Sequence, residues 1–206
     1  MARPPQDPQI RINEILDTAD QLFFTRGYHA TTISDIAKKM GVAQGTLYYY
    51  FKSKEQVLET LLDRHAAFLI SEIKNIYCLT TTPAEKIALV ISVALHRANY
   101  KNGLLLNMLY DAQNLQLKEK LFHQLELALS PWLLKIIEEG IANQDFFVPY
   151  PPTAVDYILV IADFLSKALY QKTSDEILTS RLTMAEALIE KALGAQEKTI
   201  HITPTG

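Results

Sequence analysis

A single glycine between two short helical patterns constrains the fold of this chain more than any other feature. The apolar positions before it share one helix face: Ile33, Ile36, Ala37 and Met40. Thr31 and Thr32 are candidates to cap this helix, and Gly41 tolerates the left-handed backbone that ends a helix and opens a sharp turn. A second apolar stripe follows at Val42, Leu47 and Phe51. Segment 32–54 is therefore expected to form a helix-turn-helix, in which the small Ala37 lets the two helices cross closely.

The same segment concentrates positive charge and aromatic side chains. Residues 36–54 contain four lysines (Lys38, Lys39, Lys52 and Lys54) and no acidic residue, whereas the whole chain has a net charge of −3. Successive helical residues point about 100° apart, so at least one of the three consecutive tyrosines at 48–50 should face outward. Positive charge beside hydroxyl and amide groups suits phosphate contact and base reading, and a short outward helix fits the major groove of DNA.

These residues resemble the DNA-binding domain of the tetracycline-repressor-like (TetR/AcrR) transcriptional regulators. The resemblance covers residues 10–62 and rests on the stretch 41–54, with its glycine and its Thr-Leu-Tyr and Tyr-Phe-Lys-Ser-Lys runs. It implies phosphate contacts from Thr32, Tyr48 and Lys54. It also implies that Gln44, Gly45, Thr46 and Tyr49 approach bases or the adjacent sugar-phosphate.

One residue departs from the family pattern. Ala43 stands where family members often carry a serine that caps the recognition helix. Loss of such a cap costs about 1 kcal/mol of helix stability, unless Gln44 or a water compensates.

Composition indicates a globular chain with a sizeable core, because 49% of the residues are hydrophobic and 21% are charged. No uncharged run reaches the roughly 18 residues of a transmembrane helix, and residues 1–10 lack the apolar core of a signal peptide. We therefore expect a cytoplasmic protein. Cys78 is the only cysteine, which we expect to be a buried or half-buried small hydrophobe rather than a redox sensor.

Helical patterns account for most of the chain, so the predicted fold class is all-α. Residues 1–9 are expected to be a mobile arm, and a first helix runs from Ile10 to Gly27. Ser53, with Gln56 three positions later, should cap a long helix over 54–77. Further helices are expected over 84–101, 103–113, 115–143, 152–172 and 175–193. Pro131 should kink or split its helix, residues 145–152 form a linker, and the tail 199–206 is expected to fray.

Two domains are expected, with a boundary at 53/54. Residues 1–53 comprise the arm and the DNA-binding helix-turn-helix, and residues 54–206 form a helical effector-binding and dimerisation domain, with helix 54–77 bridging the two. Residues 1–64 carry eight basic and eight acidic side chains, and residues 65–206 carry twelve and fifteen. The basic surface must therefore be a local patch.

Residues 65–206 contain more apolar residues than the core of a single helical bundle needs. Similar regulators bind an effector in a cavity between helices, so the resemblance implies an apolar pocket for a small hydrophobic or aromatic molecule. The candidate lining residues are Phe68, Ile91, Leu95, Met108, Tyr110, Trp132, Tyr157 and Phe164. The alternative for each of them is a place in the packed core.

The last two helices are candidates for a homodimer interface. Residues 157–169 are apolar on more than one face, and residues 182–193 carry a second apolar stripe. Two such helices can form a four-helix interface with a partner pair, as the resemblance also implies. A purely intramolecular core is the alternative.

No enzymatic apparatus is visible in the sequence. The five histidines form no HxxxH, HExxH or ExxH arrangement, and there is no phosphate-binding glycine loop or nucleophile motif. We therefore expect no catalysis, no metal and no cofactor. The predicted function is a ligand-responsive transcriptional regulator, more specifically a repressor, that binds a palindromic operator as a homodimer. The alternatives are a helical ligand-binding protein or enzyme without DNA binding, and a DNA-binding factor that works through a partner protein.

Overall fold

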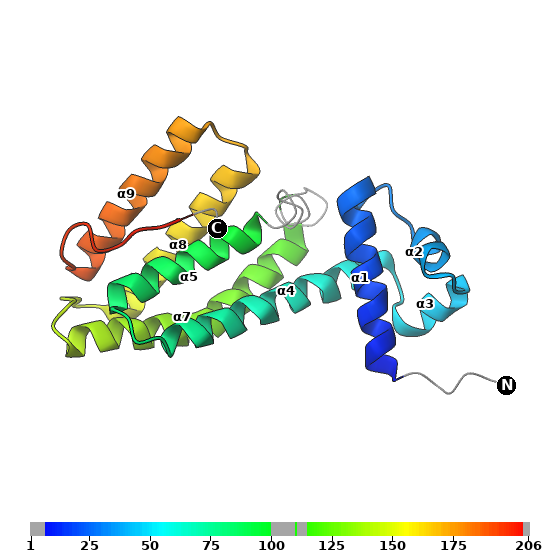
Figure 1. Ribbon diagram of the computed structural model, residues 1–206, viewed down its shortest axis with the longest axis horizontal. Helices are drawn as coiled ribbons and strands as arrows, with labels where there is room; N and C mark the ends of the chain where they lie inside the picture. Colours follow the sequence, from blue (N-terminus) through cyan, green and yellow to red (C-terminus); the bar gives the residue numbers. More distant parts are fainter. Residues whose placement is uncertain (1–6, 100–109, 111–114, 204–206) are drawn as a thin grey trace. The chain divides into compact units, whose positions relative to one another are not determined.

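The computed structural model describes residues 7–99, 110 and 115–203. The described residues form eight α-helices and no strand (Figure 1). The helices are α1 (Pro8–Arg26), α2 (Ile33–Met40), α3 (Gln44–Tyr50), α4 (Lys54–Tyr77), α5 (Pro83–Ala98), α7 (Leu115–Ala142), α8 (Pro151–Tyr170) and α9 (Asp175–Leu193). The all-α prediction is confirmed. The helix expected over 103–113 lies outside the described residues, apart from Tyr110.

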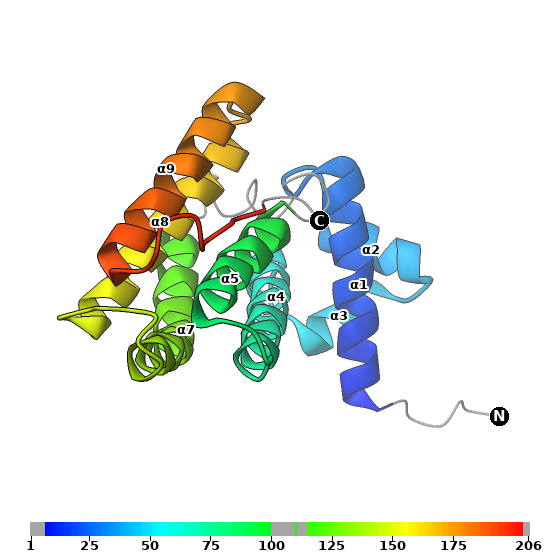
Figure 2. The ribbon, with the colours of Figure 1, turned by 60° about the vertical axis from the view of Figure 1, so that its left-hand side comes forward.

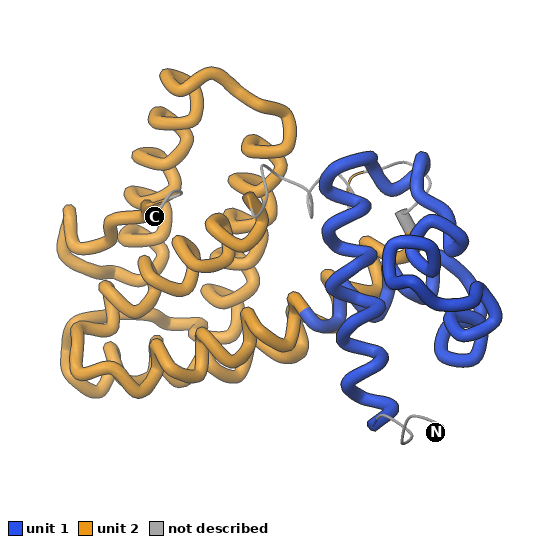
Figure 3. Tube along the Cα trace, turned by 45° about the vertical axis from the view of Figure 1, so that its right-hand side comes forward, with its two compact units in different colours: residues 1–64 blue, residues 65–206 orange. Residues whose placement is uncertain are grey.

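The chain divides into two compact units, Met1–Arg64 and His65–Gly206 (Figure 3). The division falls inside α4, so this helix contributes residues to both units. The expected boundary at 53/54 assigned all of that helix to the second domain. The functional roles of the two domains remain predictions at this point.

The first helix begins earlier than expected. The Asp7 side chain accepts a hydrogen bond from the backbone N–H of Gln9 at 2.9 Å, and Pro8 stands at the first helical position, where its missing N–H costs nothing. The expectation of a mobile arm is therefore wrong for residues 7–9. The helix ends at Gly27, as predicted.

In the first unit, α2 packs on α1, α3 packs on α2, and a core of apolar side chains lies between the helices. Its buried side chains come from all four helices. They include Ile15, Leu16, Ala19, Leu22 and Phe23 from α1, Ile33, Ile36 and Ala37 from α2, Leu47 from α3, and Val57, Leu58, Leu61 and Leu62 from α4.

In the second unit, α7 is one continuous helix that contains Pro131. Of the two outcomes expected at this residue, the split does not occur, and the kink stays a prediction. Proline removes one N–H donor, which leaves the carbonyl of Leu127 without its helical partner. The side chain of Leu127 is exposed, so this carbonyl lies on the side of the helix that water can reach. The neighbouring carbonyl of Glu126 accepts a hydrogen bond from Ser130 Oγ at 2.7 Å, which adds a contact to this turn of the helix.

The second unit has a single apolar core drawn from α4, α5, α7, α8 and α9 (Figure 2). α8 and α9 lie side by side, and α8 also packs on α5 and α7. The fully buried residues include Ile73, Ile87, Ile91, Leu95, Leu133, Ile136, Ile158, Leu165, Ile189 and Leu193.

The chain after α9 folds back on this core. Ile200 and Ile202 are only 1% and 5% exposed. The Glu190 carboxylate accepts from the backbone N–H groups of Thr199 and Ile200 at 2.8 and 3.0 Å, and Ser92 Oγ accepts from the N–H of Thr203 at 2.9 Å. The expectation of a frayed tail is therefore wrong for residues 199–203.

Cys78 follows the last residue of α4 and is exposed. The expectation that it would be buried or half-buried is wrong. The apolar stripe of α4 reaches the core through Leu69, Ile73 and Ile76, and Cys78 lies two residues after Ile76, about 200° around the helix axis and so away from that stripe.

Candidate nucleic-acid interface

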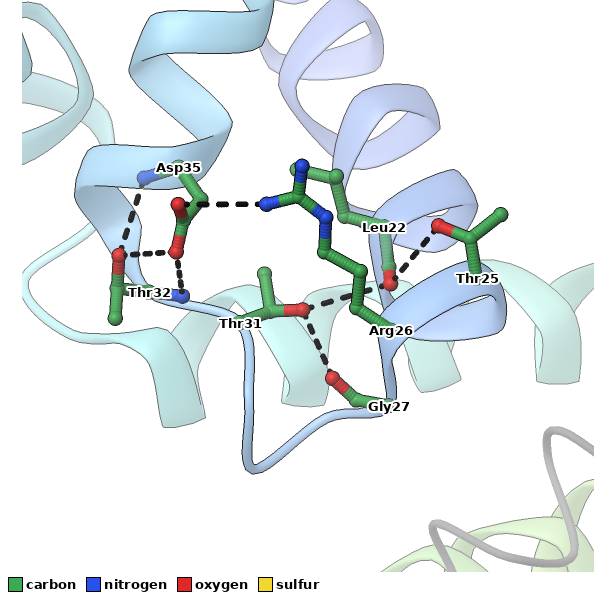
Figure 4. A network of polar contacts seen from close by, with 7 residues as sticks. All are labelled: Leu22, Thr25, Arg26, Gly27, Thr31, Thr32 and Asp35. Carbon is green, nitrogen blue, oxygen red and sulfur yellow. Dashed lines mark hydrogen bonds and ion pairs between the residues drawn. The ribbon is translucent and has the colours of Figure 1, made fainter.

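The N-terminus of α2 is closed by a reciprocal cap. Thr32 Oγ1 accepts from the backbone N–H of Asp35 at 3.1 Å, and the Asp35 carboxylate accepts from the N–H of Thr32 at 2.9 Å and from its hydroxyl at 2.6 Å (Figure 4). Hydrogen bonds from the Thr32 hydroxyl and backbone N–H lower the pKa of Asp35. The hydroxyl proton of Thr32 is thus directed at a carboxylate within its own helix, and the phosphate contact assigned to Thr32 stays a prediction.

The loop between α1 and α2 is tied to the end of α1. The hydroxyl of the buried Thr31 donates to the carbonyls of Gly27 at 2.8 Å and Leu22 at 3.4 Å. The Arg26 guanidinium lies 3.5 Å from the Asp35 carboxylate (Figure 4). These contacts set the direction in which α2 leaves the loop.

Gly41 makes the turn between the two short helices. Its backbone lies in the left-handed region, with φ 68° and ψ 31°, where a side chain would be strained. The N–H of Val42 donates to the carbonyl of Ala37 at 3.1 Å and completes the helix end. The predicted helix stop at Gly41 is confirmed.

The second helix of the motif, α3, packs against the rest of the unit on one face and is exposed to solvent on the other. Leu47 is its only buried residue. Gln44 and Gly45 are exposed, Thr46 is half-buried, and the exposed fractions of Tyr48 and Tyr49 are 51% and 81%. The structure therefore places the predicted base-reading residues on one short outward helix, and the prediction that a tyrosine faces outward is confirmed.

The start of α3 lacks a side-chain cap, as the sequence predicts. Ala43 occupies the capping position, and no side chain accepts a hydrogen bond from the first turn. The N–H of Thr46 reaches only the backbone carbonyl of Ala43, at 2.9 Å. A Cβ added to Gly45 would meet no atom within 4 Å, so packing within the chain does not require a glycine there.

Lys54 has a structural contact that the sequence did not indicate. Its Nζ donates to the carbonyl of Tyr28 at 2.9 Å and lies 4.3 Å from the centre of the Tyr28 ring. It also donates to the carbonyl of His29 at 3.5 Å. A lysine ammonium has three N–H donors, so one donor remains for a phosphate, and that role of Lys54 stays a prediction. No local pattern could reveal this contact, because the two residues lie 26 positions apart.

The start of α4 is capped as expected. The N–H of Gln56 donates to Ser53 Oγ at 3.2 Å, and the Gln56 side chain accepts from the N–H of Lys52 at 2.7 Å. Lys52 itself is exposed, as are Lys38 and Lys39 in the last turn of α2. The four lysines of the motif therefore lie at the ends of its helices, with three of them open to solvent.

The residues predicted to line an effector pocket lie in different environments. Ile91 and Leu95 are buried in the core of the second unit, and Trp132 packs against that core while half-buried. Phe68 is exposed beneath the Arg97 guanidinium, 3.5 Å from its ring centre, and Tyr157 and Phe164 are exposed on α8. The structure thus brings three of the eight residues to one cluster.

Tyr110 belongs to a separate group of contacts. Its hydroxyl donates to the Asp163 carboxylate at 2.9 Å, and its ring stacks on Tyr170 with centres 4.9 Å apart. Burial, and then the hydrogen bond and charge of Asp163, raise the pKa of Tyr110. Met108 lies outside the described residues. The pocket assignment stays a prediction.

Among residues 7–99, 110 and 115–203, no group of three or more His, Cys, Asp or Glu side chains could hold a metal ion. Within the same part of the chain, no helix combines the length and apolar character needed to cross a membrane.

Known proteins share this motif and this fold. A family model described as "Bacterial regulatory proteins, tetR family" matches residues 15–61. The fatty acid metabolism regulator protein of Bacillus subtilis is 34% identical over 132 residues, which cover 63% of this chain and 68% of that protein. The HTH-type transcriptional repressor KstR2 of Mycolicibacterium smegmatis is 40% identical over 83 residues, so the chain spans about two fifths of the length of that relative.

Solved structures agree with the fold over nearly the whole chain. A TetR transcription regulator from Haloarcula marismortui matches with a TM-score of 0.75 at 21% identity, over 91% of this chain and all of that one. FadR from Bacillus subtilis, solved in complex with stearoyl-CoA, matches with a TM-score of 0.67 at 24% identity, over 90% of this chain and 99% of that one. With the shared motif and the extent of the match to the Bacillus subtilis regulator, the chain belongs to the TetR family of bacterial regulatory proteins.

Proposed function

We propose that this chain is a transcriptional repressor that binds a palindromic operator as a homodimer and is released by a small hydrophobic effector. The observation that carries the proposal is the open face of α3. Gln44, Gly45 and Tyr49 project from a helix that only Leu47 anchors, and exposed lysines flank it. Such a face has the polar, aromatic and cationic groups that base edges and phosphates require.

Each residue of the motif has a role in this proposal. Gln44, Gly45, Thr46 and Tyr49 approach the bases or the adjacent sugar-phosphate, and Tyr48 and Lys54 contact phosphates. Thr32, which caps the start of α2, also contacts a phosphate of the DNA backbone. The rigid Gly41 turn and the Thr32–Asp35 cap support this assignment, because they hold the two helices at a fixed angle before DNA arrives.

Dimerisation is proposed through α8 and α9. Each helix carries large apolar side chains that remain exposed in the single chain, spaced by three, four or seven residues, so that they form one stripe per helix. These residues are Tyr157, Val160 and Phe164 on α8, and Ile177, Met184 and Leu188 on α9. Exposed stripes on two adjacent helices are what an isologous four-helix interface would cover.

The proposed effector is a fatty acyl thioester of coenzyme A. Two relatives support this choice, the fatty acid metabolism regulator and the FadR structure that contains stearoyl-CoA. Among the candidate lining residues, Ile91 and Leu95, which are buried in the core of the second unit, are proposed to contact its acyl chain. Binding would favour a dimer conformation in which the two α3 helices no longer fit successive half-sites, so DNA affinity falls by the ratio of effector affinities in the two states.

Fluorescence anisotropy with a labelled duplex from the region upstream of the protein's own gene tests the proposal. Tyr49→Ala should weaken binding, because an exposed ring that meets the DNA is lost. Tyr150→Ala is the matched control, since Tyr150 is 73% exposed and lies at the start of α8. Equal affinity of the two variants would refute the assigned interface. The lack of any rise in anisotropy with the wild type at low salt would refute DNA binding.

A further inference from the structure

A pair of aromatic rings joins α4 to α7 in the second unit. Trp132, the only tryptophan of the chain, lies half-buried on α7, and its ring meets that of Tyr77 at the end of α4 edge to face, with centres 5.6 Å apart. Neither the helix-turn-helix nor the exposed stripes of α8 and α9 involve these rings.

Three lysines from three helices converge on the two rings. The ammonium of Lys135 on α7 lies 4.5 Å from the centre of the Trp132 ring and 5.8 Å from that of Tyr77. Lys74 on α4 lies 5.7 Å from the Trp132 ring, and Lys86 on α5 lies 5.6 Å from the Tyr77 ring. The three ammoniums therefore lie around one pair of rings.

Only one of these charges is neutralised. Lys86 is buried, and its ammonium contacts both carboxylate oxygens of Glu139 at 2.8 and 2.9 Å. Lys74 and Lys135 are exposed, and among the described residues no carboxylate lies within 4.0 Å of either ammonium. Two uncompensated cations thus face the rings.

This local excess of positive charge stands out in residues 65–206, which carry twelve basic and fifteen acidic side chains. At an exposed site, a cation over an aromatic face gains only about 0.5–1 kcal/mol. A charge-assisted hydrogen bond to a phosphate is stronger. When a phosphate binds, the ammoniums of Lys74 and Lys135 would therefore leave the rings and form hydrogen bonds to the phosphate oxygens.

We propose that Lys74, Lys135, Trp132 and Tyr77 form a binding site for a phosphorylated ligand, with a phosphate held between the two ammoniums. Inorganic phosphate and a nucleotide, including the nucleotide portion of coenzyme A, share this chemistry. A nucleotide would gain further from the Trp132 ring, because a purine has a flat face that stacks on aromatic side chains. The coenzyme A case rests on the proposed function, whereas the site itself does not.

Tryptophan fluorescence tests this site directly, because all indole emission comes from Trp132. The full chain is titrated at constant ionic strength with coenzyme A, adenosine 3′,5′-bisphosphate, sodium phosphate and, as an uncharged control, adenosine. Lys74→Gln and Lys135→Gln each remove one ammonium at an exposed position. Lys191→Gln, an exposed lysine in the last turn of α9, is the matched control.

The expected result is a saturable change in emission with at least one phosphate-bearing probe and none with adenosine. Either glutamine variant in the site should weaken binding about tenfold, as for a lost hydrogen bond between charged groups, and Lys191→Gln should not. A response to both nucleotides but not to sodium phosphate identifies a nucleotide as the ligand. Equal responses to all three phosphate-bearing probes identify inorganic phosphate.

The site is refuted if no probe produces an emission change or calorimetric heat at concentrations on the order of 1 mM. It is also refuted if neither glutamine variant alters binding. Operator affinity measured on the same variants should equal that of the wild type, because residues 74 and 135 lie outside segment 32–54. Loss of the phosphate site and loss of DNA binding therefore give separate readouts.

Discussion

Gly45 offers a test in which stability and DNA affinity should change in opposite directions. It is the second residue of α3, it is exposed, and an added Cβ would meet no atom within 4 Å. Its backbone is outside the left-handed region in which side chains are strained. The chain itself therefore tolerates Gly45→Ala, and any need for a bare backbone must come from a partner.

The expected magnitudes follow from this geometry. Replacing a compatible helical glycine by alanine stabilises a protein by about 0.4–1 kcal/mol, mainly by restricting the unfolded chain. For a chain of this length, that gain raises the melting temperature by about 1–4 °C. A methyl group forced into a closely packed interface costs about 1–3 kcal/mol, which corresponds to a loss of DNA affinity of roughly 5- to 150-fold.

Thermal unfolding and duplex anisotropy on the same sample measure the two effects. Gly140→Ala is the matched control for stability, because a Cβ at this position would fall on the ring of Phe146 and should destabilise the chain. Gln21→Ala, at an exposed position of α1 outside the motif, is the control for DNA binding. If Gly45→Ala stabilises the chain and leaves operator affinity unchanged, DNA does not approach α3 at this residue, and the reasoning is refuted.

Three further predictions concern stability. Ala43→Ser should supply the missing cap of α3 and stabilise the chain by about 1 kcal/mol in denaturant unfolding; no gain would mean that the first turn of α3 is already satisfied. Burial raises the pKa of Glu190, but the N–H groups of residues 198–200 lower it overall below the usual 4.5. The ionised Glu190 therefore stabilises the folded chain above about pH 4.5, and this contribution is lost as the pH falls through the pKa of Glu190 in the folded state. A Glu190→Gln variant should lose less stability than the wild type over this pH range. Ile200→Ala should cost about 2–5 kcal/mol if the tail is part of the core, and an unchanged melting temperature would contradict that.

The helix-turn-helix could be predicted because its signals are local. The Gly41 turn, the Thr32 cap and the anchor Leu47 all act within a few residues of one another, and the uncapped Ala43 followed from one missing hydroxyl. That at least one of the tyrosines at 48–50 faces outward followed from helical geometry alone. Elements of this kind depend little on the rest of the fold.

Contacts between distant residues could not be predicted in the same way. The tail is held by Ser92, which bonds Thr203 across 111 positions, and no pattern within residues 199–203 indicates that partner. The same limit applied to Lys54 and the Tyr28 carbonyl. Among the pocket candidates, periodicity marked apolar faces but could not decide which faces the core covers, so it did not separate the buried Leu95 from the exposed Phe164.

The central claim is that segment 32–54 binds operator DNA through phosphates and bases. Its most direct test is the anisotropy of a labelled upstream duplex, titrated with the wild-type chain over a series of salt concentrations. The account predicts tight binding of a dimer at about 50 mM salt and an affinity that falls linearly on logarithmic axes, with a slope reduced by roughly 2 in a Lys54→Ala dimer. Absence of binding at low salt, or an affinity independent of salt, would contradict it.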